Sequence, residues 1–288
     1  MTVARPPLSV PRFKPSALLR AASIHAFIIA MAFVTLFPFL WMVGTSLKPP
    51  KEVFRPGVHL LPTAPTLGNY ATAVQRAPLG RFLLNGVIVS GSILVLQLLV
   101  IIPAAYAFAR MTFPGRDLLF WLVLAALVVP GYVTAVPNFL LLSGWGLINT
   151  YPALILPFVG SAFGIFLLRQ FFRQIPGEIL DAALLDGCGA GRLVWHVLLP
   201  LTRPAIAAFA VFSIVTHWND FFWPLVVIQS SHLYTPPAGI AYFADAEAGA
   251  NWGVVMAAAV IVVTPLVAVF LVARRQFIES MAHVSIKG

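Results

Sequence analysis

Long apolar stretches, each with at most one formal charge, alternate with short polar connections along the whole of this sequence. The apolar stretches cover residues 21–47, 82–109, 118–168, 204–228 and 248–273. Each is long enough for the roughly 20 residues that a helix needs to cross a membrane. The third is too long for one helix, and turn-forming residues between Ser143 and Asn149 divide it into two. The pattern therefore predicts an all-α membrane protein with six transmembrane helices.

Composition agrees with a membrane protein and excludes several other classes. Hydrophobic residues make up 60% of the chain and charged residues 9%, whereas a soluble domain carries about 25% charged residues on average. A soluble enzyme, a nucleic-acid module and a disordered protein are therefore excluded. The net charge of +9 comes from basic residues that lie singly or in pairs between apolar stretches, not from one basic stripe. The single cysteine, Cys188, excludes a disulfide framework and a multi-cysteine metal site.

The distribution of Lys and Arg predicts the orientation of the chain. We interpret the first apolar stretch as a retained helix, because it is too long for a secretory signal and no small-residue cleavage site follows it. Thirteen Lys and Arg residues then lie in the tails and connections on the N-terminal side, against five on the other side. The positive-inside rule therefore predicts that both termini are cytoplasmic. We expect a cytoplasmic tail at 1–20, a transmembrane domain at 21–275 and a second tail at 276–288.

The cytoplasmic connection after the fourth span has an unusual composition. Pro176 suits a first helical turn, where acidic residues such as Glu178 are favoured by the helix dipole. Asp186 and Gly187 supply a turn, and a second short helix is expected at 190–198. A helix lying on lipid headgroups would carry large apolar residues opposite Lys and Arg, but this segment presents acids and small residues. It is better suited to docking a soluble partner than to lying on lipid.

Several motifs in this order resemble those of the MalG-like sugar permeases of binding-protein-dependent ABC importers. The matching pieces are PFLWMVGTSLKP (38–49), AAYAFARMTFPGR (104–116), IPGEILDAALLDG (175–187), WNDFFWPLVV (218–227) and the terminal KG (287–288). The run from Asp181 to Pro200, which begins in the third of these pieces, is similar to the EAA motif of that family. The resemblance implies the type I ABC importer permease fold and a bacterial or archaeal plasma membrane location.

The resemblance also implies a division of labour between subunits. The segment 175–200 would contain the coupling helix, which seats in a groove of a cytoplasmic ATPase. Its coupling residues would be Glu178, Asp181, Ala182, Ala183, Asp186 and Gly187. The implied partners are a second homologous permease, a dimer of ATPase subunits and an extracytoplasmic solute-binding protein. ATP and Mg would be bound by the ATPase and no cofactor by this chain, which is not an enzyme and has no P-loop, since none of its lysines follows a glycine.

Asp220 is the only formal charge within a predicted span. Charged groups at membrane depth are costly and mark transport pathways or polar partners. With Trp218, Asn219 and the helix-breaking Pro224, it forms a candidate gate or translocation path. The alternative is a cluster at the outer interface, with Trp218 and Trp223 as interfacial aromatics. A rival function is an autonomous proton-coupled transporter that uses Asp220, although the spans contain no further acid to relay a proton.

Overall fold

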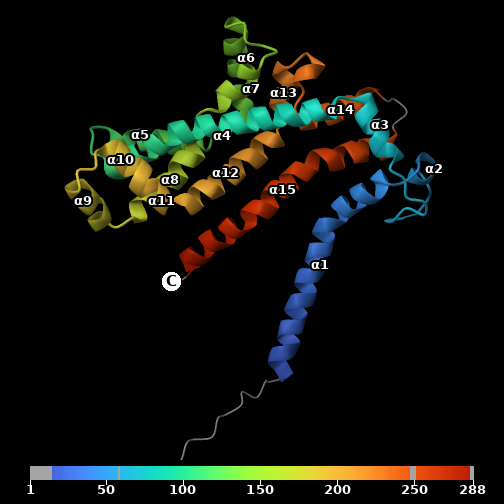
Figure 1. Cartoon of the computed structure of the whole chain (residues 1–288), viewed down its shortest axis with the longest axis horizontal. Coiled ribbons are helices and arrows are strands. Elements are labelled where there is room, and N and C mark those ends of the chain that lie inside the picture. The colour runs from blue at the N-terminus through green and yellow to red at the C-terminus, as the bar shows by residue number, and fades with distance from the viewer. Residues whose placement is uncertain (1–14, 58, 247–250, 286–288) are drawn as a thin grey trace, which may run out of the picture.

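The computed structural model describes residues 15–57, 59–246 and 251–285. These residues form helices joined by short connections, without a β-strand in the described part (Figure 1). The prediction of an all-α protein is confirmed. The long helices are α1 (Pro15–Ser46), α4 (Leu79–Arg110), α8 (Ala162–Gln174), α12 (Arg203–Trp218) and α15 (Trp252–Ser285).

The remaining helices are short. They are α2 (Pro50–Val53), α3 (Gly68–Arg76), α5 (Arg116–Ala126), η1 (Gly131–Thr134), α6 (Ala135–Gly144), α7 (Tyr151–Ile155), η2 (Leu156–Phe158), α9 (Gly177–Leu185), α10 (Ala190–Leu193), the π-helix η3 (Val194–Leu198), α11 (Leu199–Leu201), α13 (Phe222–Val227), η4 (Ser231–Leu233) and α14 (Pro236–Ala246).

Helical structure crosses the predicted boundaries at residues 20 and 275, because α1 begins at Pro15 and α15 continues to Ser285. The tail residues 1–14 and 286–288 lie outside the described part of the chain.

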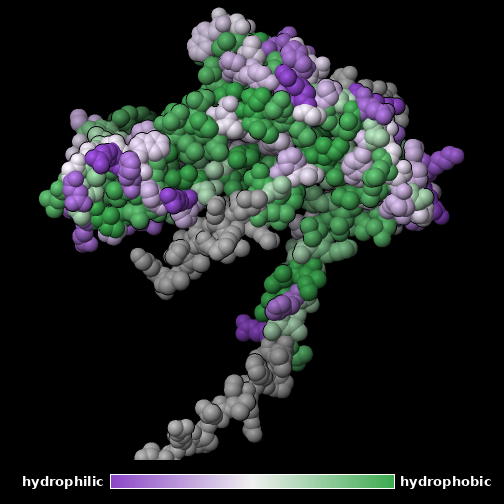
Figure 2. All heavy atoms as spheres, in the orientation of Figure 1, coloured by the Kyte–Doolittle hydropathy of each residue, from purple (hydrophilic) through white to green (hydrophobic). Residues whose placement is uncertain are grey.

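The core of the array is formed by α4, which packs against α8 and α12, while α12 also packs against α15 (Figure 1). Most of α1 is exposed, and only its C-terminal end is buried. Hydrophobic surface covers much of the array between its two ends, and polar surface gathers at the end that holds α9, at the end that holds α2 and α3, and over α13 (Figure 2). An apolar belt between two polar ends is the surface expected of a protein that spans a membrane.

Glycines allow the central helices to approach closely. A Cβ on Gly164 of α8 would lie 2.7 Å from the Phe209 ring of α12 and 2.8 Å from Ile101 of α4. A Cβ on Gly86 of α4 would lie 2.6 Å from Pro236. Small residues at such crossings are typical of membrane helices, whose association depends on close van der Waals packing.

By length and composition, the described residues hold three helices that could cross a membrane alone: Leu19–Ser46, Leu79–Arg110 and Trp252–Leu271. Three bent helix pairs raise the number to six if each pair is one span. The pairs are Arg116–Ala126 with Gly131–Gly144 (96°), Tyr151–Phe158 with Ala162–Gln174 (44°), and Ala190–Leu201 with Arg203–Trp218 (81°). The described residues therefore hold three to six candidate spans, and the last bent pair begins at Ala190, ahead of the predicted stretch 204–228.

Three breaks differ from the predicted helices. The fourth expected helix, which was to run to Leu168, is divided between Phe158 and Ala162. We expected the stretch that begins at Leu118 to stay helical until the turn at Ser143, but α5 ends at Ala126 and the chain turns before α6. The reason is Pro130, which has no amide hydrogen for a helical bond and restricts the residue before it. The expected helix 204–228 is also interrupted, because α12 ends at Trp218 and α13 begins only at Phe222.

Polar side chains organise the end of the molecule that holds α2 and α3. Asn69 donates hydrogen bonds from Nδ2 to the carbonyl oxygens of Ser46 and Lys48, both at 2.8 Å. Glu52 accepts a hydrogen bond from the backbone N–H of Thr63 at 2.7 Å, and this contact holds the pKa of the Glu52 carboxyl below its ordinary value. The connection between α1 and α4 is therefore fixed by its own hydrogen bonds.

Candidate functional site

The predicted coupling segment folds as a short helix with a sharp end. α9 begins after Pro176, whose extended backbone turns the chain away from α8. At its C-terminus, the N–H of Cys188 donates to the carbonyl of Ala183 and the N–H of Gly187 donates to Leu184, both at 3.0 Å. This pair of bonds is the Schellman motif, and it places Gly187 at φ 75°. Glycine adopts that left-handed conformation without the steric cost of a Cβ.

One face of α9 is packed and the other is open. Leu180 and Ala183 are buried in a cluster with Phe172 of α8 and Leu198 of η3. On the open face, Leu184 is half exposed and Leu185 is 90% exposed. A leucine that is almost fully exposed at a polar end of the molecule has no packing role within the described chain. With Leu184 it forms a small exposed apolar patch on this face of α9.

The six predicted coupling residues divide between these two faces. Ala183 packs inward, while Glu178, Asp181, Ala182, Asp186 and Gly187 are exposed. A Cβ on Gly187 would meet no atom within 4 Å. The helix therefore presents its acids and small residues together with Leu184 and Leu185, two residues that the composition of the segment did not single out.

A hydrogen-bonded arginine connects this segment to the centre of the array. Arg110, the last residue of α4, donates hydrogen bonds to the carbonyl oxygens of Phe172 and Ile175. Ile175 is the residue between α8 and Pro176. The short chain that leads into α9 is thus attached to α4 by Arg110.

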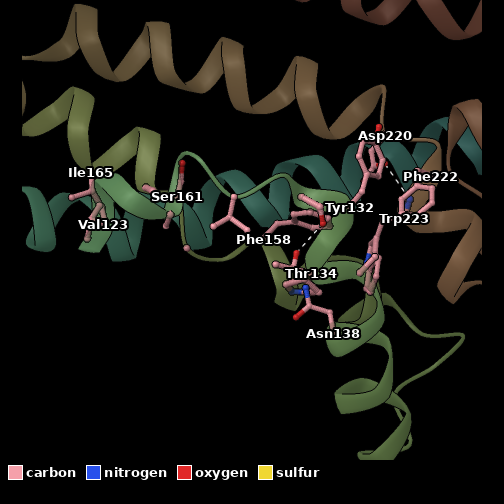
Figure 3. Close-up of a pocket in the computed structure, with 17 residues that line it drawn as sticks. Val123, Tyr132, Thr134, Asn138, Phe158, Ser161, Ile165, Asp220, Phe222 and Trp223 are labelled. Carbon is pink, nitrogen blue, oxygen red and sulfur yellow. Dashed lines mark hydrogen bonds between the residues drawn. The ribbon is translucent and has the colours of Figure 1, made fainter. Parts of the chain in front are cut away.

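The second candidate region is a cavity of about 720 Å³. Its walls come from α5, η1, α6, η2, the N-terminal end of α8 and the break between α12 and α13 (Figure 3). The polar side chains of the lining are Asp220, Asn138, Thr134, Ser161 and Tyr132. Most of the remaining lining is apolar or aromatic, so the cavity has the mixed character of a small-molecule site.

Asp220 is fixed at the edge of this cavity by the helix break. Its Oδ1 accepts a hydrogen bond from the backbone N–H of Trp223 at 3.2 Å, which caps the first turn of α13. Beside it, the rings of Tyr132 and Phe222 meet edge to face, with centroids 4.8 Å apart. The carboxylate and the two aromatic rings therefore share one wall of the cavity (Figure 3).

The four residues of the predicted gate do not all lie at the cavity. Asp220 lines the cavity, whereas Trp218 is buried and donates from Nε1 to the carbonyl of Val262 in α15 at 3.2 Å. Asn219 is exposed and bonds back to its own helix, and Pro224 is buried within α13. Trp223, the other aromatic residue of the interfacial alternative, is also buried. The structure therefore brings only Asp220 of these four to the cavity.

Sequence reasoning missed a buried polar network behind the cavity. Gln97 of α4 donates from Nε2 to the carbonyl of Phe158 at 2.9 Å and accepts from Ser213 of α12 at 2.6 Å. The Phe158 ring lines the cavity and lies 4.9 Å from the ring of His217. Gln97 carries no charge, so a search for charged residues within the spans passes over it. A search for any polar side chain within the apolar stretch would have found it.

Comparison with known proteins identifies the family. Residues 97–283 match the family described as "Binding-protein-dependent transport system inner membrane component". The chain is 36% identical to the diacetylchitobiose uptake system permease protein NgcG of Streptomyces coelicolor, over 91% of this chain and 88% of that protein. It is 35% identical to the arabinooligosaccharides transport system permease protein AraQ of Halalkalibacterium halodurans, over 90% and 93%.

A third relative, with a lower sequence identity, is named for the transport of a different solute. The sn-glycerol-3-phosphate transport system permease protein UgpE of Yersinia enterocolitica is 32% identical over 89% of this chain and 94% of that protein. Among solved structures, a chain of a bacterial ABC transporter involved in the import of the acidic polysaccharide alginate has the same fold. Its TM-score is 0.83 at 21% identity, and the match covers 93% of this chain and all of that one. This chain therefore belongs to the family of inner-membrane components of binding-protein-dependent transport systems, and it is a transport permease, not an enzyme.

Proposed function

We propose that this chain imports a sugar or a related polar solute, and that α9 couples its movement to ATP hydrolysis by a separate subunit. The observation that carries the proposal is the open face of α9, where Leu185 and the acidic residues are exposed and available to contact another protein. The oligosaccharides in the names of NgcG and AraQ support a carbohydrate solute.

The helix α8 provides the mechanical connection from α9 to the cavity. Its N-terminal end, with Ser161 and Ile165, lines the cavity, and Phe172 at its C-terminal end belongs to the same buried cluster as Leu180 of α9. α8 has 13 residues, and at about 1.5 Å per residue it spans about 20 Å. A displacement of α9 by the ATPase is therefore transmitted by a rigid helix to the wall of the cavity.

In this proposal the remaining subunits supply what the chain lacks. A dimer of ATPase subunits binds ATP and Mg on the cytoplasmic side, where both termini of this chain also lie. A second, homologous permease completes the pathway against the exposed apolar surface, which includes most of α1. An extracytoplasmic solute-binding protein delivers the solute to the opposite end. The partner class is supported by a crystal structure of the alginate ABC transporter in complex with its periplasmic protein, which shares this fold at a TM-score of 0.62.

The experiment is uptake into proteoliposomes that hold the assembled complex, with its binding protein supplied. Radiolabelled diacetylchitobiose and arabinotriose serve as probes, and the proton gradient is collapsed with a protonophore. We expect uptake of at least one probe that requires ATP and persists without the gradient. Uptake that disappears with the gradient despite ATP would support the rival proton-coupled carrier, in which Asp220 takes up and releases the proton.

A further inference from the structure

A second polar cavity, of about 510 Å³, lies between α4, α5 and α8 at the end of the molecule that holds α9. Arginines dominate its polar lining: Arg116 begins α5, while Arg169 and Arg173 lie one turn apart on α8. One carboxylate, Asp117, is also present. Three guanidinium groups against one carboxylate give this cavity a net positive charge, and neither α9 nor the larger cavity requires that charge.

Arg169 is held in a fixed position inside this cavity. Its side chain is buried, with a relative exposure of 9% for the residue. Its Nε donates to the carbonyl oxygen of Phe108 at 3.1 Å, and its guanidinium lies 3.8 Å from the centroid of the Phe120 ring. Within the described residues its two terminal nitrogens have no hydrogen-bond acceptor. Because Arg169 lines the cavity, these donors are free to bind an anion that enters it.

The other two arginines extend the site toward its mouth. Arg116 donates from Nε to Asp117 at 2.9 Å and from Nη1 to the carbonyl of Met111 at 3.2 Å, so one positive charge is balanced locally. Arg173 is exposed and makes no hydrogen bond in the part of the chain that the structure describes. Two guanidinium groups, of Arg169 and Arg173, therefore remain available for the oxygens of one anion. Guanidinium binds phosphate in a two-pronged manner.

The surroundings favour a lipid over a free anion. Trp121 lines the cavity and is 68% exposed, and the neighbouring Leu118 and Leu122 on α5 are also exposed. Tryptophan is enriched at the level of lipid headgroups. Acyl chains can therefore lie along α5 while the headgroup enters the cavity. Basic cavities between transmembrane helices on the cytoplasmic side are known to bind anionic headgroups.

We propose that this cavity binds the phosphate of an anionic phospholipid in the membrane leaflet on the side of α9. Arg169 and Arg173 bind the phosphate oxygens, Arg116 and the N-terminal end of α5 add positive potential, and Trp121 contacts the acyl chains. The lipid connects the cytoplasmic ends of α5 and α8. This end of α8 is the one that leads into α9.

The test measures lipid binding to the full-length chain in its purified complex. Native mass spectrometry in detergent follows titration with phosphatidylglycerol or with phosphatidylcholine of the same acyl chains. We expect phosphatidylglycerol to bind at least tenfold more tightly. Arg173→Gln removes one charge-assisted contact without touching the folded core, and should weaken phosphatidylglycerol binding about five- to tenfold. Arg203→Gln, an exposed arginine outside the cavity, is the matched control and should change binding less than twofold.

Three outcomes would overturn the proposal. The first is equal binding of the two lipids, and the second is equal loss in the Arg173 and Arg203 variants. The third is displacement of phosphatidylglycerol by millimolar inorganic phosphate, which would show that the site serves a free anion. Circular dichroism and size-exclusion elution of each variant confirm that it folds. Because the readout is lipid binding, its result is independent of whether the complex transports a sugar.

Discussion

Arg110 at the end of α4 donates a hydrogen bond from Nε to the carbonyl oxygen of Phe172 in α8, at 3.1 Å. The carbonyl groups in the last turn of a helix have no partner within that helix. The guanidinium satisfies this one and also the carbonyl of Ile175. One side chain therefore closes the end of α8 and attaches the start of the coupling segment to α4, the central helix of the array.

We predict that Arg110→Gln loosens α9 and uncouples ATP hydrolysis from uptake. The shorter amide leaves the carbonyls of Phe172 and Ile175 without their charged donor, at a cost of about 1–3 kcal/mol. Hydrogen exchange of the α9 amides should accelerate, and the ratio of solute imported to ATP hydrolysed should fall. Arg192→Gln, an exposed arginine of α10 with no side-chain hydrogen bond in the described chain, is the control for exchange and should leave the α9 amides protected. Unchanged exchange in Arg110→Gln would contradict the attachment.

Two substitutions at Gly187 distinguish the effect of local backbone strain from the effect of blocked partner docking. Gly187→Ala imposes a left-handed backbone on a residue with a Cβ and should cost about 1–2 kcal/mol of local stability. Because that Cβ is small and would meet no atom of the described residues within 4 Å, the ATPase should still associate. Gly187→Arg adds a long cation at the same strain, and should abolish ATPase association and uptake while membrane insertion persists. Affinity purification and membrane flotation measure both properties. Normal uptake in the Arg variant would refute docking at this position.

Substitution of Asp220 tests whether this residue forms part of the cavity wall or carries a proton. Asn keeps the shape of the side chain and can still accept the hydrogen bond from the N–H of Trp223, so Asp220→Asn should retain substantial ATP-dependent uptake. Asp220→Leu removes the acceptor and should impair uptake by leaving that N–H unsatisfied. Initial uptake rates in proteoliposomes compare the two variants. Complete loss of transport in the Asn variant would favour the proton-coupled carrier.

The predicted orientation can be checked with cysteine labels. Single cysteines introduced at Leu61 and Ser231, both exposed and remote from α9, should react with an impermeant maleimide added outside intact cells. The native Cys188 beside α9 should react only after the membrane is opened. Reaction of Cys188 from outside in sealed cells would invert the topology.

The sequence predicted the helical architecture because apolar length and turn residues act locally. It also predicted the end of α9, since Asp186 and Gly187 are strong stop signals whatever surrounds them. The break after α5 was missed, although Pro130 is visible, because a proline within an apolar run does not by itself show whether the helix bends or ends.

Other features depend on residues that are distant in the sequence. Arg110 and Phe172 become neighbours only when α4 and α8 pack, and Gln97 reaches Phe158 and Ser213 in the same way. The gate prediction grouped Trp218 with Asp220 because they are adjacent in the chain. Because α12 ends between them, Trp218 contacts α15 while Asp220 lines the cavity.

The central claim is that the open face of α9 docks on an ATPase, and a photocrosslink from Leu185 tests it most directly. A photoreactive amino acid at Leu185, which is 90% exposed, is activated in cells that produce the whole transport system, with the same residue at Leu61 as control. We predict a crosslinked product from position 185 whose partner peptides belong to a P-loop ATPase, and none from position 61. Crosslinks from position 185 only to lipid, or equal ATPase crosslinking from both positions, would contradict the account.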